Sequence, residues 1–318
     1  DWEKENDCKV NLTVIPWDKY EETYTTALNS GEGPDVGYMY NEMFPTYIDA
    51  GAVEDMSSYV TDEDKKEYKY LSNGNMMDGQ YGWPLVTGVP FVLYYNEDIL
   101  NALGEKAPET WDDFARICQE ATKDTDGDGK VDQYGFACGM NTSDIGAMQI
   151  LNAYYYSALW QNGGQVYNDD LKSVSFADEA GKEAVTWLKG LTSYMNEDFM
   201  SLSWSDAFSN VFGAGKAAFG ITRSSQTDGT TFAETYPDLN WNFVTSLKNK
   251  DFGTFGATDC LTLMSACEDK DLAMDFIKYV TGSEFMTAYH AKCPGAALTE
   301  SEPYVGDEKM EKIYTEDK

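Results

Sequence analysis

Short apolar strands alternate with amphipathic helices along this chain of 318 residues. Residues 9–15 alternate apolar with polar side chains, which predicts a half-buried strand. Residues 18–29 place Tyr20, Tyr24 and Leu28 on one helical face, and residues 35–40 predict a second strand. A strand–helix–strand unit is typical of α/β folds and favours a parallel sheet.

The same alternation continues along the rest of the chain. Apolar runs bounded by turn residues predict the strands, and apolar stripes at helical spacing predict the helices. Strands are expected at residues 90–95, 134–138, 216–221 and 260–264, and helices at 110–121, 145–160, 178–194, 206–212 and 271–280.

Residues 124–132 have the ligand pattern of an EF-hand-type calcium loop, with Gly129 at position six, where the turn is sharpest. Position twelve should be a bidentate Glu and is Gly135, so weak binding is expected. The sequence therefore predicts a structural calcium ion, typical of an extracellular protein, with a solvated acidic turn as the alternative. The predicted ligands stand at positions one, three, five, seven and nine: Asp124, Asp126, Asp128, Lys130 and Asp132.

Composition excludes several classes of function. The chain has 55 acidic and 23 basic residues, a net charge of -32, which repels nucleic acid and anionic membranes but tolerates a neutral or cationic ligand. No apolar run approaches the ~20 residues of a membrane span.

The six cysteines form no CxxC pair, which argues against zinc and leaves buried thiols or disulfides open. His290 is the only histidine and is expected to be partly exposed, so a Ser-His-Asp mechanism is disfavoured.

Six motifs in register carry a resemblance to a known family. They are SGEGPDV at 30–36, QYGWP at 80–84, LYYNEDIL at 93–100, PETWDDF at 108–114, WQNGG at 160–164 and FGAGKAAF at 212–219. In this order they resemble the family 1 extracellular solute-binding proteins, which are the sugar-capturing subunits of ABC importers and are maltose-binding-protein-like. The resemblance covers nearly the whole chain.

This resemblance implies an α/β protein with the two-lobed periplasmic-binding-protein type II fold. Each lobe would be a mixed sheet flanked by helices, with the ligand cleft between the lobes. The first lobe would comprise residues 1–88 plus 258–293, and the second 89–257 plus 294–318, with a third crossing near 293–296. Compared with the family, the chain is expected to lack the first strand and helix and to stop short of the last helices.

Predicted ligand contacts lie at strand ends and at the crossings. Tyr40, Asn41 and Glu42 follow the strand 35–40, where ligands bind in parallel sheets. Aromatic rings suit the flat faces of sugars, and short polar groups suit their hydroxyls. Trp17 is interpreted as a packing or loop anchor. The resemblance and the aromatic composition add Thr87, Gly88, Tyr154, Tyr156, Trp160, Arg223, Ser224, Ser225, Thr258 and Asp259, although the aromatic stripe 154–160 also suits a core helix.

The resemblance therefore predicts a non-enzymatic, monomeric protein that closes on an oligosaccharide and delivers it to the transmembrane subunits of an ABC permease. It would be extracellular, as a membrane-tethered lipoprotein of a Gram-positive cell or a periplasmic protein. Three alternatives stay open. They are a glycoside hydrolase with paired carboxylates, a calcium-dependent adhesion or scaffold module, and a family member that binds a cationic solute.

Overall fold

The computed structural model describes residues 2–31, 33–142, 146–168, 173–227 and 230–315. The chain forms two compact units. Unit 1 comprises Asp1–Val89 with Ala257–Tyr314, and unit 2 comprises Pro90–Gly256 with Thr315–Lys318. The chain passes between them within two strands, β4 (Trp83–Asn96) and β8 (Gly256–Leu263), and again between Tyr314 and Thr315. In the described part of the chain, no helix is both long and apolar enough to cross a membrane.

Unit 1 is built on the strands β1 (Val36–Tyr40), β8 and the first half of β4, with β8 in the middle. β1 and β8 run antiparallel, with Val36 opposite Leu263 and Tyr40 opposite Asp259. Successive side chains of a strand point to opposite faces. Leu261 and Leu263 therefore pack into one core, and Cys260 packs into another.

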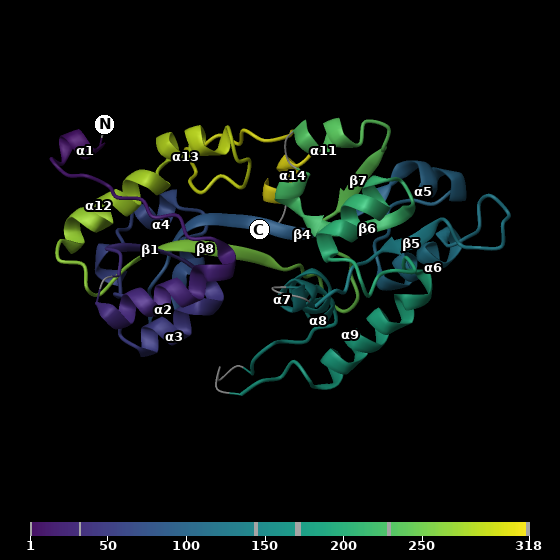
Figure 1. The fold of residues 1–318 in the computed structure, drawn as a ribbon, viewed down its shortest axis with the longest axis horizontal. Coiled ribbons are helices and arrows are strands. Elements are labelled where there is room, and N and C mark those ends of the chain that lie inside the picture. The colour runs from purple at the N-terminus through teal and green to yellow at the C-terminus, as the bar shows by residue number, and fades with distance from the viewer. Residues whose placement is uncertain (1, 32, 143–145, 169–172, 228–229, 316–318) are drawn as a thin grey trace. The chain divides into compact units, whose positions relative to one another are not determined.

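Helices cover both faces of this sheet (Figure 1). α12 (Lys270–Thr281) buries Met274 and Ile277 against one face, while α2 (Tyr20–Ser30) and α3 (Phe44–Asp49) cover the other. The remaining short elements of unit 1 are α1 (Trp2–Glu5), η1 (Trp17–Lys19), η2 (Asn41–Met43), η3 (Ser57–Tyr59), α4 (Asp64–Glu67), η4 (Leu71–Gly74), β2 (Asn75–Met76), β3 (Gly79–Gln80), α13 (Ser283–His290) and α14 (Glu311–Thr315).

Unit 2 contains a mixed sheet. The second half of β4 pairs antiparallel with β6 (Ala217–Arg223) and β7 (Trp241–Val244), and β5 (Tyr134–Ala137) pairs parallel with β6. Its core gathers aromatic residues from several elements, including Phe114, Phe136 and Phe219. The remaining elements are α5 (Glu97–Leu103), α6 (Trp111–Ala121), α7 (Gly146–Ile150), η5 (Leu151–Tyr155), α8 (Tyr156–Gln161), α9 (Glu179–Gly190), η6 (Leu191–Tyr194), α10 (Trp204–Ala207), η7 (Phe208–Gly213), η8 (Ser224–Gln226) and α11 (Thr230–Thr235).

Two predictions about the elements of unit 1 are wrong. Residues 9–15 form no strand, and Leu12 and Val14 are 84% and 81% exposed, because no neighbouring strand pairs with this segment among the described residues. The parallel pair predicted from it is therefore absent there. His290 is buried rather than partly exposed, and its Nδ1 lies 2.5 Å from a carboxylate oxygen of Glu302, which is also buried.

The predicted third crossing near residues 293–296 is wrong in position, because Ala257–Tyr314 stays in unit 1 and the chain passes to unit 2 only at Thr315. Backbone hydrogen bonds hold the segment there. The N–H of Lys69 donates to the carbonyl of Leu298 at 2.9 Å, and the N–H of Glu300 donates to the carbonyl of Glu67 at 2.8 Å. All six cysteines are free thiols, four of them buried.

Candidate functional site

Three half-buried aromatic rings of unit 2 stack on one another. We call Tyr156, Trp160 and Phe255 the aromatic triad. The ring centroids of Tyr156 and Trp160 lie 5.7 Å apart, and those of Trp160 and Phe255 lie 6.2 Å apart with only 5° between the planes. Tyr156 and Phe255 complete the set at 5.8 Å and 28°. The sequence predicted the first two of these residues, and the structure brings them together with a third.

Phe255 was missed by sequence reasoning. Its backbone is fixed on both sides: its N–H donates to Oγ of Ser157 at 3.2 Å, and its carbonyl accepts from the N–H of Phe91 at 2.8 Å. Ser157 belongs to α8, the same helix as Tyr156 and Trp160. The signal that could have found Phe255 is an aromatic residue flanked by Gly253 and Gly256, beside the predicted second crossing.

Gln161 holds the loop of Phe255 against α8. Its Oε1 accepts from Trp111 Nε1 at 2.7 Å, and its Nε2 donates to the carbonyl of Gly253 at 2.9 Å. A Cβ on Gly253 would lie 2.7 Å from the Cβ of Trp160, so only glycine permits this close approach. Hydrogen bonds and close backbone packing thus hold the loop of Phe255 in place against α8.

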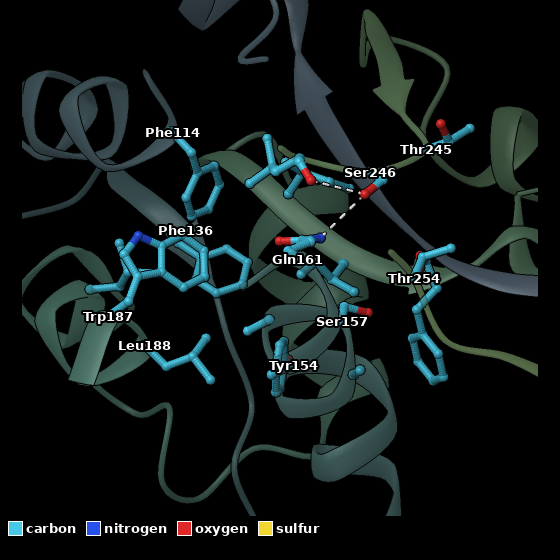
Figure 2. A pocket seen from close by; sticks show the side chains of 17 residues that line it. Phe114, Phe136, Tyr154, Ser157, Gln161, Trp187, Leu188, Thr245, Ser246 and Thr254 are labelled. Carbon is cyan, nitrogen blue, oxygen red and sulfur yellow. Dashed lines mark hydrogen bonds between the residues drawn. The ribbon is translucent and has the colours of Figure 1, made fainter. Parts of the chain in front are cut away.

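A small internal cavity lies beside this loop. Figure 2 shows Ser157, Gln161 and Thr254 on its wall, together with core aromatics such as Phe114 and Phe136. Its volume is about 40 Å³. Pockets for small molecules begin at ~300 Å³, so this space is too small for a sugar. This cavity is therefore not a sugar site.

Arg223 supplies a cation at the carboxyl end of β6. Its Nη2 donates to Oε1 of Gln149 at 2.8 Å, and its guanidinium lies 5.5 Å from the ring of Phe91 and 5.7 Å from that of Trp204. These ring contacts leave the guanidinium fixed in orientation and half-buried. Of the neighbouring predicted contacts, Ser224 is buried and Ser225 is exposed.

Tyr154 has no exposed ring face for a ligand, so its prediction as a ligand contact is corrected. Its side chain is 3% exposed and packs in the core of unit 2. Its hydroxyl accepts from the N–H of Gly139 at 3.3 Å, and burial raises the pKa of the Tyr154 phenol well above its usual range. The residue is a neutral side chain in the core of unit 2.

Unit 1 offers a second group of exposed aromatic and acidic side chains at the end of β1. Trp17 is 60% exposed, and its ring centroid lies 6.1 Å from that of Tyr40. Trp17, interpreted as a packing or loop anchor, is thus exposed while its ring also contacts those of Tyr20 and Tyr38. The hydroxyl of Tyr40 donates to Glu21, Asn41 is half-buried and Glu42 is exposed.

Asp259 lies opposite Tyr40 on β8 and is held by the neighbouring strand. The hydroxyl of Tyr38 donates to its carboxylate. Burial raises the pKa of Tyr38, and the charge of Asp259 raises it further, so the phenol stays a neutral donor. One face of the carboxylate is thus occupied by Tyr38.

Thr87 and Thr258 bind each other rather than lying open for a ligand, which corrects their prediction as contacts. They are 3% and 5% exposed, and their Oγ1 atoms lie 3.0 Å apart. Burial and this hydrogen bond occupy both hydroxyls. Gly88 follows Thr87 within β4.

The aspartate loop brings together part of its predicted ligand set. Carboxylate oxygens of Asp124, Asp126 and Asp128 lie within 4.8 Å of one another. Asp124 accepts from the N–H groups of Gly129 at 2.8 Å and Gly127 at 2.6 Å, and these hydrogen bonds lower the pKa of its carboxyl group. Both glycines have φ values near the left-handed region, 91° and 81°, which suits a tight ligand loop.

Asp132 and Lys130 contribute differently from the other three loop residues. Asp132 accepts from the N–H and the hydroxyl of Thr125, at 2.8 and 2.7 Å. The N–H of Lys130 donates to Asp128 at 2.8 Å. The loop is therefore closed at its base by Thr125 and Asp132, with the first three aspartates gathered at its tip.

Comparison with known proteins places the fold in one family. The family model of the bacterial extracellular solute-binding proteins matches residues 1–303. A binding protein of Brucella abortus (strain 2308) is 25% identical over 286 residues, covering 85% of this chain and 64% of that protein. The chain thus spans less than two thirds of the length of this relative.

Two solved structures are similar in fold. An extracellular solute-binding protein from Staphylococcus aureus, in complex with maltose, matches 98% of this chain and 78% of its own at a TM-score of 0.76 and 16% identity. RafE from Streptococcus pneumoniae is the second structure. The match covers 99% of this chain and 80% of the RafE chain, with a TM-score of 0.74 and 22% sequence identity. A complex of RafE with raffinose has also been solved. The family match over most of the chain, supported by this common fold, is decisive: the chain belongs to the bacterial extracellular solute-binding proteins.

Proposed function

We propose that the protein captures an oligosaccharide for an ABC importer. The observation that carries this proposal is the aromatic triad, whose three rings stand within 28° of parallel and are half-exposed. Sugar rings present flat C–H faces, and aromatic faces are their usual partners, so the ring surface that the triad leaves exposed suits a sugar better than a compact polar solute.

Polar groups near each candidate surface would select the hydroxyl pattern. In unit 2 the guanidinium of Arg223 is a fixed donor, and the hydroxyl of Ser225 is exposed. In unit 1 the carboxylates of Glu42 and Asp259 are acceptors. A site built to bond a hydroxyl rejects an analogue that lacks it, because its own polar groups are left unpaired.

Capture would proceed by hinge movement of the two units about the strands β4 and β8. No covalent step is required, so the protein would bind its ligand stoichiometrically and release it unchanged to a permease. The family is described as extracellular. We propose a tethered lipoprotein or periplasmic location and a monomeric state on the same basis.

Titration calorimetry with di-, tri- and tetrasaccharides, including maltose and raffinose, tests this function. We expect one sugar molecule bound per chain and intact sugar recovered afterwards. Release of shorter sugars would favour the glycoside hydrolase alternative. Binding of spermidine or thiamine with no response to any sugar would favour a cationic solute instead.

We also propose that the aspartate loop holds a structural calcium ion. Its support is the gathering of three carboxylates with hydrogen-bonded left-handed glycines, a donor set that suits a hard cation. The loop connects α6 to β5, and we propose that calcium there braces unit 2 and does not contact the sugar. Chelation should lower the melting temperature and leave sugar affinity unchanged. Loss of partner binding on chelation, without any sugar response, would support the scaffold alternative.

A further inference from the structure

Three side chains of unit 1 join the two crossing strands just before they leave it. Thr87 lies on β4 and Thr258 on β8, and their hydroxyls lie 3.0 Å apart. Asn73 of η4 adds a third member, since its Nδ2 donates to Thr258 Oγ1 at 3.1 Å and lies 3.5 Å from Thr87 Oγ1. Both threonines are almost fully buried, so their mutual bond is shielded from water. We call Asn73, Thr87 and Thr258 the threonine lock.

A second connection joins the same two crossings inside unit 2. The N–H of Phe91 donates to the carbonyl of Phe255 at 2.8 Å. The hydroxyl of Thr254 also donates to the carbonyl of Phe91. The two crossing segments are therefore tied to each other on both sides of the boundary, once through side chains and once mainly through backbone.

We propose that the threonine lock is a positioning device that confines hinge bending to residues 88–90 and 256–257. A hinge is made of the few residues that absorb backbone rotation, and its ends are set by where rigid contacts resume. Thr87 and Thr258 are tied to each other on the unit 1 side of these residues, and Phe91 and Phe255 are tied to each other on the unit 2 side. This inference rests on the proposed capture by hinge movement.

The lock also connects the hinge to the candidate sugar surface. Phe255 is both a ring of the aromatic triad and the residue whose carbonyl holds Phe91. Rotation about the adjacent residues 256–257 would then carry the triad as a rigid part of unit 2. On the unit 1 side, Thr258 is next to Asp259, whose carboxylate is held by Tyr38. The threonine lock therefore sets the residues at which the backbone rotates relative to the triad in unit 2 and to Asp259 in unit 1.

Thr258→Val tests the lock because valine keeps the volume of threonine and removes its hydroxyl. The matched control is Thr262→Val, on the same strand, where an equally buried hydroxyl donates to the carbonyl of Tyr81 at 2.8 Å within unit 1. Hydrogen–deuterium exchange is measured on the sugar-free protein, in peptides that cover residues 84–92 and 254–260.

We expect exchange in these peptides to rise about threefold or more in Thr258→Val and to stay at the wild-type level in Thr262→Val. Asn73→Ala, which changes an exposed residue, should give the same direction and serves if Thr258→Val does not fold. Equal exchange at the crossings in Thr258→Val and Thr262→Val, with Asn73→Ala unchanged, would overturn the lock.

A sugar titration separates this inference from the proposed function. With raffinose or maltose, whichever binds the wild type, Thr258→Val should weaken affinity several-fold and Thr262→Val should not, because a looser hinge has more freedom to lose on closure. If no sugar binds the wild type while exchange still rises only in the lock variants, the proposed function fails and the lock stands. Unchanged affinity in Thr258→Val would contradict its role in positioning.

Discussion

At the scale of single residues, position along one helix decides which aromatics can meet a ligand. Tyr156 and Trp160 are four residues apart and share a face of α8, whereas Tyr154 points into the core. Sequence reasoning found all three rings but had no means to assign their faces, because η5 and α8 are aromatic on several sides. Phe255 comes from a distant loop, and only the fold brings it to the triad.

The central ring of the triad should contribute strongly to sugar binding. Trp160→Ala removes a ring that stacks on both Tyr156 and Phe255. We expect affinity to fall about tenfold or more, which corresponds to about 1.4 kcal/mol. Phe252→Ala is the matched control, an aromatic ring of the same loop that is 60% exposed and lies outside the triad. Calorimetry that gave both variants the same loss would contradict a specific platform.

Tyr154→Phe should show whether Tyr154 stabilises the core of unit 2 or contacts the sugar directly. The substitution removes the acceptor of the Gly139 N–H in a buried place. The free energy of unfolding should fall by about 1–3 kcal/mol, the cost of leaving a buried donor unpaired. Sugar affinity of the folded variant should stay at the wild-type level. Denaturant unfolding and calorimetry measure the two effects, and a selective loss of sugar affinity would restore Tyr154 as a contact.

At the level of helices and strands, the predictions are right where the capping residues and the pattern of apolar side chains both match the observed burial. α6 begins at its predicted N-cap, Thr110, whose side chain and Asp113 form a capping box, and its apolar stripe is buried as expected. Residues 9–15 have an equally clear strand pattern, yet a strand needs a neighbour to pair with, and no local signal reports whether one is present. The path of residues 294–314 likewise depends on distant partners such as Glu67 and Lys69.

The attachment of α12 to α4 should depend on pH. Asp64 of α4 pairs with Lys278 of α12 at 2.6 Å. Burial raises the pKa of the Asp64 carboxyl group, but hydrogen bonds from Lys278 and Thr61 outweigh it and hold that pKa below its ordinary 3.8. A lowered folded-state pKa stabilises the protein above the unfolded-state value and loses that effect as the pH falls below it.

Wild type and Asp64→Asn should therefore differ in unfolding free energy at pH 7, and the difference should shrink as the pH falls from the unfolded-state pKa through the lowered folded-state pKa of Asp64. Urea unfolding between pH 2.5 and 7 measures the difference. Asp62→Asn is the control, since Asp62 pairs with Lys65 at 3.4 Å in a side chain that is 93% exposed, and it should have little effect at any pH. A difference for Asp64→Asn that persisted undiminished at pH 2.5 would contradict this assignment.

At the scale of the whole molecule, the net charge of -32 separates the candidate ligands. A neutral sugar gains nothing from this field, whereas a cationic solute would be attracted and then released by salt. We expect sugar affinity to change less than twofold between 0.05 and 0.5 M NaCl, because stacking and hydroxyl hydrogen bonds are barely screened. A steep loss of affinity with salt, measured by calorimetry, would point to a charged ligand.

A thermal-shift screen tests whether an oligosaccharide binds on the aromatic triad. Wild type, Trp160→Ala and Phe252→Ala are melted with a panel of oligosaccharides that includes maltose and raffinose, and with spermidine. A bound ligand raises the melting temperature according to RT ln(1 + [L]/Kd). We predict that at least one sugar stabilises wild type and Phe252→Ala but not Trp160→Ala. Stabilisation by spermidine alone, or equal sugar stabilisation of all three proteins, would contradict the account.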